Sequence, residues 1–230
     1  MSDVALHYFG SKARAESIKL ALYLAHIPYK FEPVQDWPKM KEEGLKSGSL
    51  PFGQVPMLHM DGMDMVQTVA ILRYISANYL SKNLAPKEAV TVDMMVEGWN
   101  DFLNEAYQFI YVHKDQLPQF WENGAKKNLT NLENFYKRIG KRFMAADVPT
   151  IADAHAYTTL RQLKALKSDL LADYPALQKW EKDMDSLEEV KAYMTSDSSP
   201  ISESSVLSES TSSGIAVSAP AANHFSVGNP

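Results

Sequence analysis

The sequence contains no cysteine among its 230 residues. This absence excludes disulfide bonds, thiolate metal sites and any chemistry in which the protein supplies a nucleophilic thiol. If the chain carries out sulfur chemistry, a ligand must bring the sulfur. The six histidines show no spacing typical of a metal site, so we also expect no bound metal.

A positive charge balance and long apolar runs are missing as well. The formal net charge is −5 at pH 7, which argues against a nucleic-acid partner, because neutralising phosphates requires clustered Lys and Arg. No run of about 18 apolar residues occurs, and the first residues lack the order of a secretory signal. We therefore expect a soluble, cytoplasmic protein with no membrane partner.

The residues that are present divide the chain into four segments. Residues 1–80 alternate strand-like runs with helical patterns, and residues 81–88 form a polar linker. Residues 89–195 show helical periodicity with little strand signal. The prediction is an α/β domain followed by an all-α domain. Residues 196–230 are rich in Ser, Ala, Gly and Pro without periodicity, so we expect a disordered tail.

Two helices and a hairpin are expected in the first segment. The pattern of residues 14–25 is amphipathic, and a second helical pattern begins at Thr68. Between them, Asp61 and Gly62 can take the positive backbone dihedrals of a tight turn joining two short strands. This order predicts a small sheet with mixed strand directions, where ligands gather at the loops that leave the strand ends.

A proline interrupts the strand-like run "LPFGQVPML", residues 50–58. Proline removes a hydrogen bond from a sheet, and the Val55–Pro56 bond is a place where a cis peptide is accessible at small cost. Such a bond would leave the backbone of Val55 free at a sheet edge to pair with a peptide-like ligand. The simpler alternative is a proline that merely begins the strand.

Gln67 and Thr68 stand where the second hairpin strand meets a helix. Unpaired N–H groups and the positive end of the helix dipole at such a junction bind carboxylates. An ordinary N-cap at Thr68 is the alternative. Together with Gln54, Val55 and Pro56, this pair predicts a groove that recognises a small acidic peptide.

Five ordered stretches carry a family resemblance: "LHYFGSKARAES", "DWPKMK", "LPFGQVPML", "DGMDMVQTVAILRYI" and "PTIADAHAY". They resemble the signatures of cytosolic glutathione transferases of the tyrosine type, nearest to the alpha and sigma classes. The resemblance covers residues 3 to about 195. It implies a thioredoxin-like N-terminal domain, a helical C-terminal domain, glutathione as co-substrate and a homodimeric detoxification enzyme.

The resemblance assigns the chemistry to Tyr8 and Arg14. Tyr8 matches the tyrosine whose hydroxyl donates to the sulfur of bound glutathione, and Arg14 matches a cation near that sulfur. A free thiol has a pKa of about 8.5, so both groups would favour the nucleophilic thiolate. Taken alone, Tyr8 is more typical of a core aromatic and Arg14 of a solvated charge. The chain has Lys12-Ala13 where the family often has Arg-Gly.

The tripeptide contacts are implied by the same resemblance. Lys41 matches the partner of the glycine carboxylate, although Lys39 and Lys46 compete for that role. Asp101 would reach the γ-glutamyl amine of the neighbouring subunit's ligand. Without the resemblance, Asp101 is more typical of a solvated acid on a helix surface. The complete set of glutathione contacts is Trp37, Lys41, Gln54, Val55, Pro56, Gln67, Thr68 and Asp101.

The second pocket and the dimer contact follow from the resemblance too. Phe52 resembles the aromatic key that alpha-like subunits insert between two helices of a partner, with a core position as the alternative. The electrophile would bind between the loop after Tyr8 and the helical domain. Its candidate walls are Phe9, Phe102, Glu105, Ala106, Phe109 and Tyr111.

Two other functions remain open. A glutathione-dependent isomerase or peroxidase acting on lipids, similar to sigma-class prostaglandin synthases, would use the same thiolate with a different second pocket. A non-catalytic carrier similar to lens crystallins would keep only the fold, and the retained tripeptide motifs argue against it. Residues 150–153, "TIAD", resemble a capping box and predict the start of a buried helix rather than a catalytic site.

Overall fold

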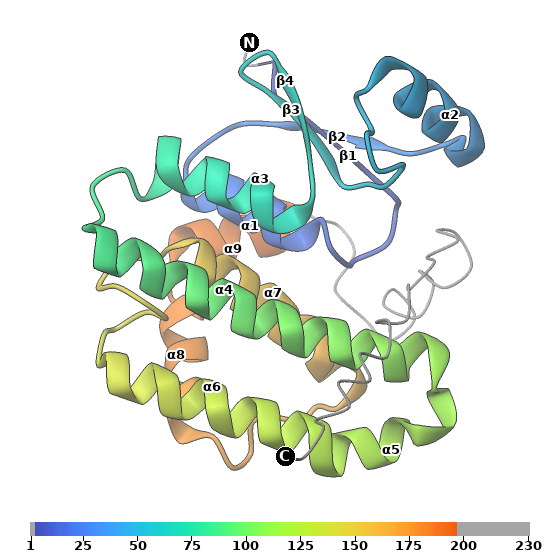
Figure 1. The fold of residues 1–230 in the computed structure, drawn as a ribbon. Helices are drawn as coiled ribbons and strands as arrows, with labels where there is room; N and C mark the ends of the chain where they lie inside the picture. The colour runs from blue at the N-terminus through green and yellow to red at the C-terminus, as the bar shows by residue number, and fades with distance from the viewer. Residues whose placement is uncertain (1–2, 197–230) are drawn as a thin grey trace, which may run out of the picture.

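The computed structural model describes residues 3–196 (Figure 1). Its strands are β1 (Ala5–Tyr8), β2 (Lys30–Pro33), β3 (Met57–Met60) and β4 (Met63–Val66). They form a four-stranded sheet in the order β2-β1-β3-β4, with β1 parallel to β2 and the other pairs antiparallel. The predicted tail, residues 196–230, lies outside the described residues except for Ser196.

The helices of the first half lie in two places. Helices α1 and α3 lie between the sheet and the helical half, whereas α2 stands apart from them (Figure 1). Their bounds are α1 (Glu16–Leu24), α2 (Trp37–Ser47) and α3 (Thr68–Ile75), which continues as a π-helical turn over Ser76–Leu80. This is the predicted thioredoxin-like α/β arrangement.

The second half of the described chain is helical. Helix α7 contacts α1 of the first half as well as α4, and residues 151–160 of α7 are buried without a break. Helix α4 begins at Pro86, inside the segment expected as a linker. The helices are α4 (Pro86–Tyr107), α5 (Leu117–Phe120), α6 (Lys126–Ile139), α7 (Ile151–Leu166), α8 (Pro175–Asp185) and α9 (Glu188–Ser196). Short π or 3₁₀ turns cover Gln108–Val112, Lys114–Gln116 and Trp121–Ala125. Within residues 3–196, no helix is long and apolar enough to cross a bilayer.

The predicted hairpin turn is confirmed. Asp61 and Gly62 both have positive φ angles, 53° and 74°, as a tight turn between β3 and β4 requires. The Asp61 carboxylate also accepts hydrogen bonds from the hydroxyls of Tyr74 and Tyr79. These bonds fasten the hairpin to the C-terminal end of α3.

The capping box at the start of α7 is also confirmed. Thr150 Oγ1 accepts from Ala152 N at 3.2 Å, and Asp153 Oδ2 accepts from Thr150 N at 2.8 Å. The other carboxylate oxygen of Asp153 accepts from Met144 N at 2.8 Å and Trp180 Nε1 at 2.9 Å. Burial raises the pKa of the Asp153 carboxyl, while these hydrogen bonds act to lower it. The residue therefore ties α7, the loop before it and α8 to one another.

Candidate functional site

The loop after β1 reaches across to α4. Tyr8 is the last residue of β1, is 2% exposed, and packs its ring 5.4 Å from that of Phe9. Arg14 Nη2 donates to Asn104 Oδ1 at 2.9 Å, and its guanidinium carbon lies 5.1 Å from the centre of the Tyr107 ring. The arginine is thus held at a defined place between the two halves. Helix α1 begins two residues later than the sequence pattern predicts, which is within the usual scatter of helix ends.

A buried glutamine supports this contact from α7. Gln162 is 1% exposed and accepts a hydrogen bond from the Tyr107 hydroxyl at 2.6 Å. Its amide nitrogen donates to the carbonyl oxygens of Thr158 at 3.2 Å and Ala13 at 3.4 Å. Sequence reasoning missed Asn104, Tyr107 and Gln162, which lie far from Arg14 along the chain. The one available signal was the spacing of residues 104, 107 and 111, which would lie on one face of a continuous helix.

A second group of predicted residues comes together at the start of α2. The Phe9 and Trp37 rings meet edge to face with centroids 5.4 Å apart, and Lys41 Nζ lies 6.0 Å from the Trp37 ring centre. Gly53 has φ 57°, and a Cβ added there would lie 3.0 Å from Lys41 Cε. The loop before β3 therefore passes close to Lys41. Phe9, expected in the electrophile pocket, contacts the rings of both Tyr8 and Trp37.

The backbone at Val55 has no hydrogen-bond partner in the part of the chain that the structure describes. The Val55–Pro56 peptide bond is cis, and β3 begins only at Met57. Within the described residues, neither the N–H nor the C=O of Val55 makes a hydrogen bond. An open backbone segment next to a strand can pair with an extended peptide ligand.

Gln67 adopts a strained conformation where β4 meets α3. Its φ of 71° lies in the left-handed region that L-residues rarely occupy, and such strain costs about 1–3 kcal/mol and concentrates at ligand sites. Gln67 Nε2 donates to Gln54 Oε1 at 3.1 Å, which brings two predicted contacts together. The N-cap of α3 is Gln67, without a side-chain cap bond, and Thr68 is the first helical residue. The alternative of an N-cap at Thr68 is therefore wrong.

The candidate electrophile walls other than Phe9 lie along α4 and the π-helical turn that follows it, and they contact different partners. Tyr111 packs on Tyr107 with ring centroids 5.1 Å apart, and so lies on the Arg14 side. Phe109 stacks on Phe120 with centroids 4.8 Å apart. Phe102 and Ala106 are fully buried, and Phe102 lies between Trp99 and Phe120. Glu105 Oε2 accepts from Asn128 Nδ2 at 2.7 Å, on the α6 side. Tyr107 thus contacts both Arg14 and Tyr111, whereas Phe102 contacts Trp99 and Phe120, and Glu105 contacts Asn128.

A buried histidine lies close enough to feel the charge of Arg14. His155 on α7 is 2% exposed, and neither ring nitrogen has a hydrogen-bond partner among the described residues. Burial, assisted by Arg14, lowers the pKa of His155 to about 4 from an ordinary value of 6.5. The imidazole is therefore neutral in the folded protein at pH 7.

This histidine should make stability fall in mild acid. The folded pKa is lower than the unfolded one, so the unfolded chain binds the proton first and stability is lost between pH 6.5 and about 4. At about 1.4 kcal/mol per unit, the expected loss between pH 7 and pH 4 is about 3 kcal/mol. Urea unfolding at several pH values should show that His155→Leu removes this slope, whereas exposed His113→Asn keeps it. The same dependence of the free energy of unfolding on pH in wild type and His155→Leu would contradict the prediction. Asp153 titrates in both proteins, so its contribution cancels in the difference between them.

Two family models match the chain. "Glutathione S-transferase, N-terminal domain" matches residues 4–77, and "Glutathione S-transferase, C-terminal domain" matches residues 100–197. The chain belongs to the glutathione S-transferase family. This membership confirms the predicted resemblance and the prediction of a glutathione transferase enzyme, and members of the family use glutathione as co-substrate.

Known relatives of this transferase align with most of its sequence. It is 31% identical over 193 residues to Glutathione S-transferase 3 of Gallus gallus, covering 82% of this chain and 84% of the relative. It is 32% identical over 196 residues to Glutathione S-transferase A1 of Bos taurus, covering 82% and 86%.

Two solved structures have the same fold. "Rat hPGDS complexed with a quinoline" matches with a TM-score of 0.74 and 25% identity, covering 86% of this chain and 99% of that one. The Pi-class glutathione S-transferase of Onchocerca volvulus matches with a TM-score of 0.79 and 22% identity, covering 89% and 99%.

Proposed function

We propose that this glutathione transferase adds the thiolate of bound glutathione to apolar electrophiles, with Tyr8 donating to the sulfur and Arg14 supporting the anion. The observation that carries the proposal is the guanidinium of Arg14, fixed by Asn104 at 2.9 Å in the loop that follows Tyr8. A fixed cation and a phenol donor both favour the thiolate over the thiol. We place the enzyme in the cytoplasm, because the chain resembles the cytosolic glutathione transferases.

We assign the tripeptide to the open edge at Val55. The unpaired Val55 backbone would pair with the cysteinyl unit, and the strained Gln67 with Thr68 would hold the γ-glutamyl carboxylate at the start of α3. Lys41, which lies over Trp37, would meet the glycine carboxylate. The three contacts support an extended orientation with the sulfur directed at Tyr8.

Two assays test this function. Calorimetry should detect glutathione binding, and glutathione with a chloronitroaromatic acceptor should give rapid conjugation. Weak conjugation together with turnover of an endoperoxide or a lipid peroxide would favour the isomerase or peroxidase alternative. Absence of binding at millimolar glutathione would contradict both enzymatic functions and would favour the non-catalytic carrier.

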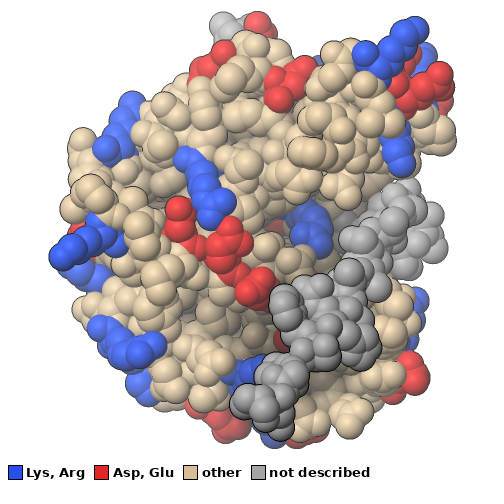
Figure 2. Space-filling view, in the orientation of Figure 1, with Lys and Arg blue, Asp and Glu red and all other residues tan. Residues whose placement is uncertain are grey.

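The surface of α4 supports a homodimer. A groove of about 820 Å³ between α4 and α6 is lined by the apolar residues Met94, Leu132 and Phe135 and by polar residues that include Asp101. Met94 is 54% exposed and Phe52 is 65% exposed, so an apolar key and an apolar residue of the groove both lie on the outside of one chain. Acidic side chains also gather over α4 in Figure 2. A twofold dimer would bury each Phe52 in the groove of its partner and bring Asp101 to the partner's ligand.

Removing the aromatic key should separate the subunits. A twofold interface contains Phe52 twice, and each buried aromatic anchor contributes about 2 kcal/mol or more, so Phe52→Ser should weaken dimerisation about 1,000-fold. Light scattering after size-exclusion chromatography at micromolar concentration should show a monomer. Val148→Ser, at a site that is 57% exposed in the loop before α7, is the matched control and should remain dimeric. A Phe52→Ser dimer of unchanged affinity would contradict this assembly.

A further inference from the structure

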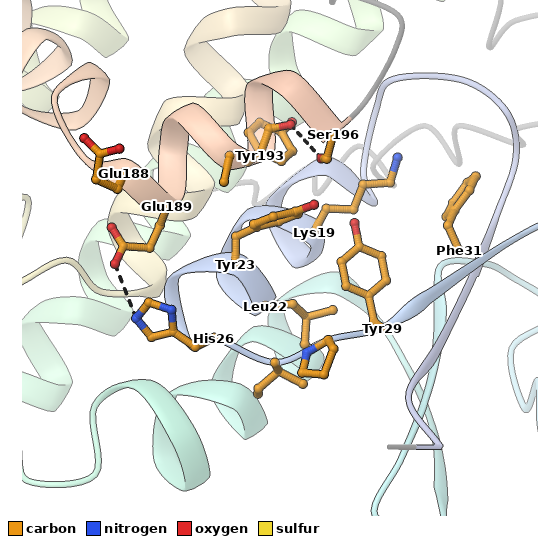
Figure 3. A pocket seen from close by; sticks show the side chains of 13 residues that line it. Lys19, Leu22, Tyr23, His26, Tyr29, Phe31, Glu188, Glu189, Tyr193 and Ser196 are labelled. Atoms are coloured by element: carbon orange, nitrogen blue, oxygen red, sulfur yellow. Dashed lines mark hydrogen bonds and ion pairs between the residues drawn. The ribbon is translucent and has the colours of Figure 1, made fainter. Parts of the chain in front are cut away.

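A cavity lies between α1, β2 and α9, and it shares no lining residue with the proposed glutathione site (Figure 3). Its volume is about 800 Å³, within the range of sites for small molecules. The walls are α1 with the loop that follows it on one side and α9 on the other. The lining residues are Lys19, Leu22, Tyr23, His26, Ile27, Pro28, Tyr29, Phe31, Glu188, Glu189, Ala192, Tyr193 and Ser196.

Aromatic rings line this cavity. The ring of Tyr23 lies edge-on to Tyr29 at 6.2 Å between centroids and to Tyr193 at 6.0 Å. Phe31 lies on the other side of Tyr29, with Lys19 Nζ 4.2 Å from its ring centre. Rings in such an arrangement offer a rigid apolar surface to a flat ligand.

Two phenol hydroxyls in the cavity have no hydrogen-bond partner within residues 3–196. Tyr193 donates to Glu16 Oε2 at 2.6 Å and is therefore used within the fold. The hydroxyls of Tyr23 and Tyr29 have no hydrogen-bond partner among the described residues, and in Figure 3 both point toward the same part of the cavity. Burial raises the pKa of Tyr29 well above its usual value of 10, so this phenol remains a neutral donor at every physiological pH. A ligand that supplies an acceptor oxygen would satisfy these donors.

Charges of both signs border the cavity and disfavour an ionic ligand. Glu188 and Glu189 lie on the α9 side, with Glu189 paired to His26 at 3.3 Å. The ammonium of Lys19, which is nearly buried, lies 2.8 Å from Glu16. Glu188 pairs with Lys191 at 2.7 Å, so each of these charges already has an opposite partner, and an ionic ligand would lose hydration without gaining a free counter-charge.

We propose that this cavity binds a neutral, flat and mainly apolar molecule whose carbonyl or ether oxygen accepts hydrogen bonds from Tyr23 and Tyr29. The site is separate from the place where we expect the electrophile, so its occupant is not consumed by conjugation. The proposal does not depend on catalysis.

Flavone, a neutral aromatic ketone, is a suitable probe. Equilibrium dialysis on the full chain saturated with S-hexylglutathione, which fills the proposed glutathione and electrophile sites, should show one flavone bound per subunit. A flavone carboxylic acid should bind at least tenfold more weakly, because its carboxylate would lose hydration without gaining a free counter-charge. Flavone binding that S-hexylglutathione abolishes, or equal binding of the acid, would overturn the proposal.

Two variants locate the bound flavone. Tyr29→Phe removes one donor and should weaken binding about fivefold. Ala192→Trp, at an exposed position of α9 that lines the cavity, should abolish binding by filling the space, whereas Ala172→Trp, exposed outside the cavity, should leave binding unchanged. Circular dichroism shows whether Ala192→Trp folds. If this variant is unfolded, the affinity of Tyr29→Phe for flavone tests the assignment. Unchanged affinity in a folded Ala192→Trp or in Tyr29→Phe would overturn the assignment. Failure of S-hexylglutathione to bind would contradict the proposed glutathione site and would leave the proposal for this cavity unaffected.

Discussion

Replacing Tyr8 by phenylalanine should lower kcat/KM for conjugation about 100-fold at pH 7, because removing one preorganised donor to a developing or existing anion costs about that much. The free thiol has a pKa of about 8.5, and a shift of about two units makes most of the bound thiol ionised at neutral pH. Without the phenol donor this shift is lost and the thiol is mostly protonated. Tyr8 is 2% exposed and phenylalanine has the same ring, so the fold should tolerate the change.

The pH dependence separates this effect from simple damage. The acid limb of the kcat/KM profile should move up by about two pH units in Tyr8→Phe, so the gap to wild type narrows above pH 9. Glutathione affinity should change little, since the contacts at Val55, Gln67 and Lys41 remain. Tyr174→Phe, which also removes one phenol hydroxyl, should behave as wild type. An unshifted limb in Tyr8→Phe would show that the phenol does not act on the sulfur.

Replacing Asp153 by alanine should destabilise the protein by at least 4 kcal/mol. The carboxylate accepts from Met144 N, Thr150 N and Trp180 Nε1, all buried donors that alanine would leave unsatisfied. Each such loss costs about 1–3 kcal/mol, against a total stability of about 5–15 kcal/mol. Little folded Asp153→Ala protein should be recovered.

A milder variant gives a measurable value. Asp153→Asn keeps the shape but points an amide N–H₂ group at Thr150 N, so the free energy of unfolding should fall by about 2 kcal/mol in a urea titration. Asp147→Ala removes an exposed acid from the same loop, where it pairs with Lys141, and should have a much smaller effect, because exposed ion pairs contribute little to stability. Equal effects of Asp147→Ala and Asp153→Asn would contradict the role of Asp153 in joining α7 to α8.

The features that could be predicted from the sequence are those whose conformation is determined by residues close together along the chain. The Asp61-Gly62 turn depends on the dihedrals that these two residues allow, and the capping box depends on Thr150 and Asp153 three positions apart. Both are local, so both are visible in a short stretch of sequence. The order of the two halves was likewise visible in the change from alternating strand and helix patterns to helical periodicity alone.

The contacts of Arg14 could not be predicted in the same way. Asn104 is 90 residues away along the chain, and Gln162 belongs to yet another helix. Helical periodicity divides α4 into faces, but it does not tell which face meets the loop after Tyr8. Phe102 and Tyr111 were therefore predicted to line one pocket, although Tyr111 packs on Tyr107 and Phe102 is buried against Trp99 and Phe120. The positive φ of Gln67 is equally invisible, because nothing in the residue type requires it.

Helix α7 limits how new variants of this protein can be assembled. Its buried residues contact α1 from one half of the molecule and α4 from the other, so a single core serves both. A chimera that joins this sheet to the helices of a relative, with the crossover placed in the polar stretch before α4, would set a foreign α7 against the native α1. Exchange of specificity by domain shuffling would therefore need compensating changes along α1, and the two halves should diverge together.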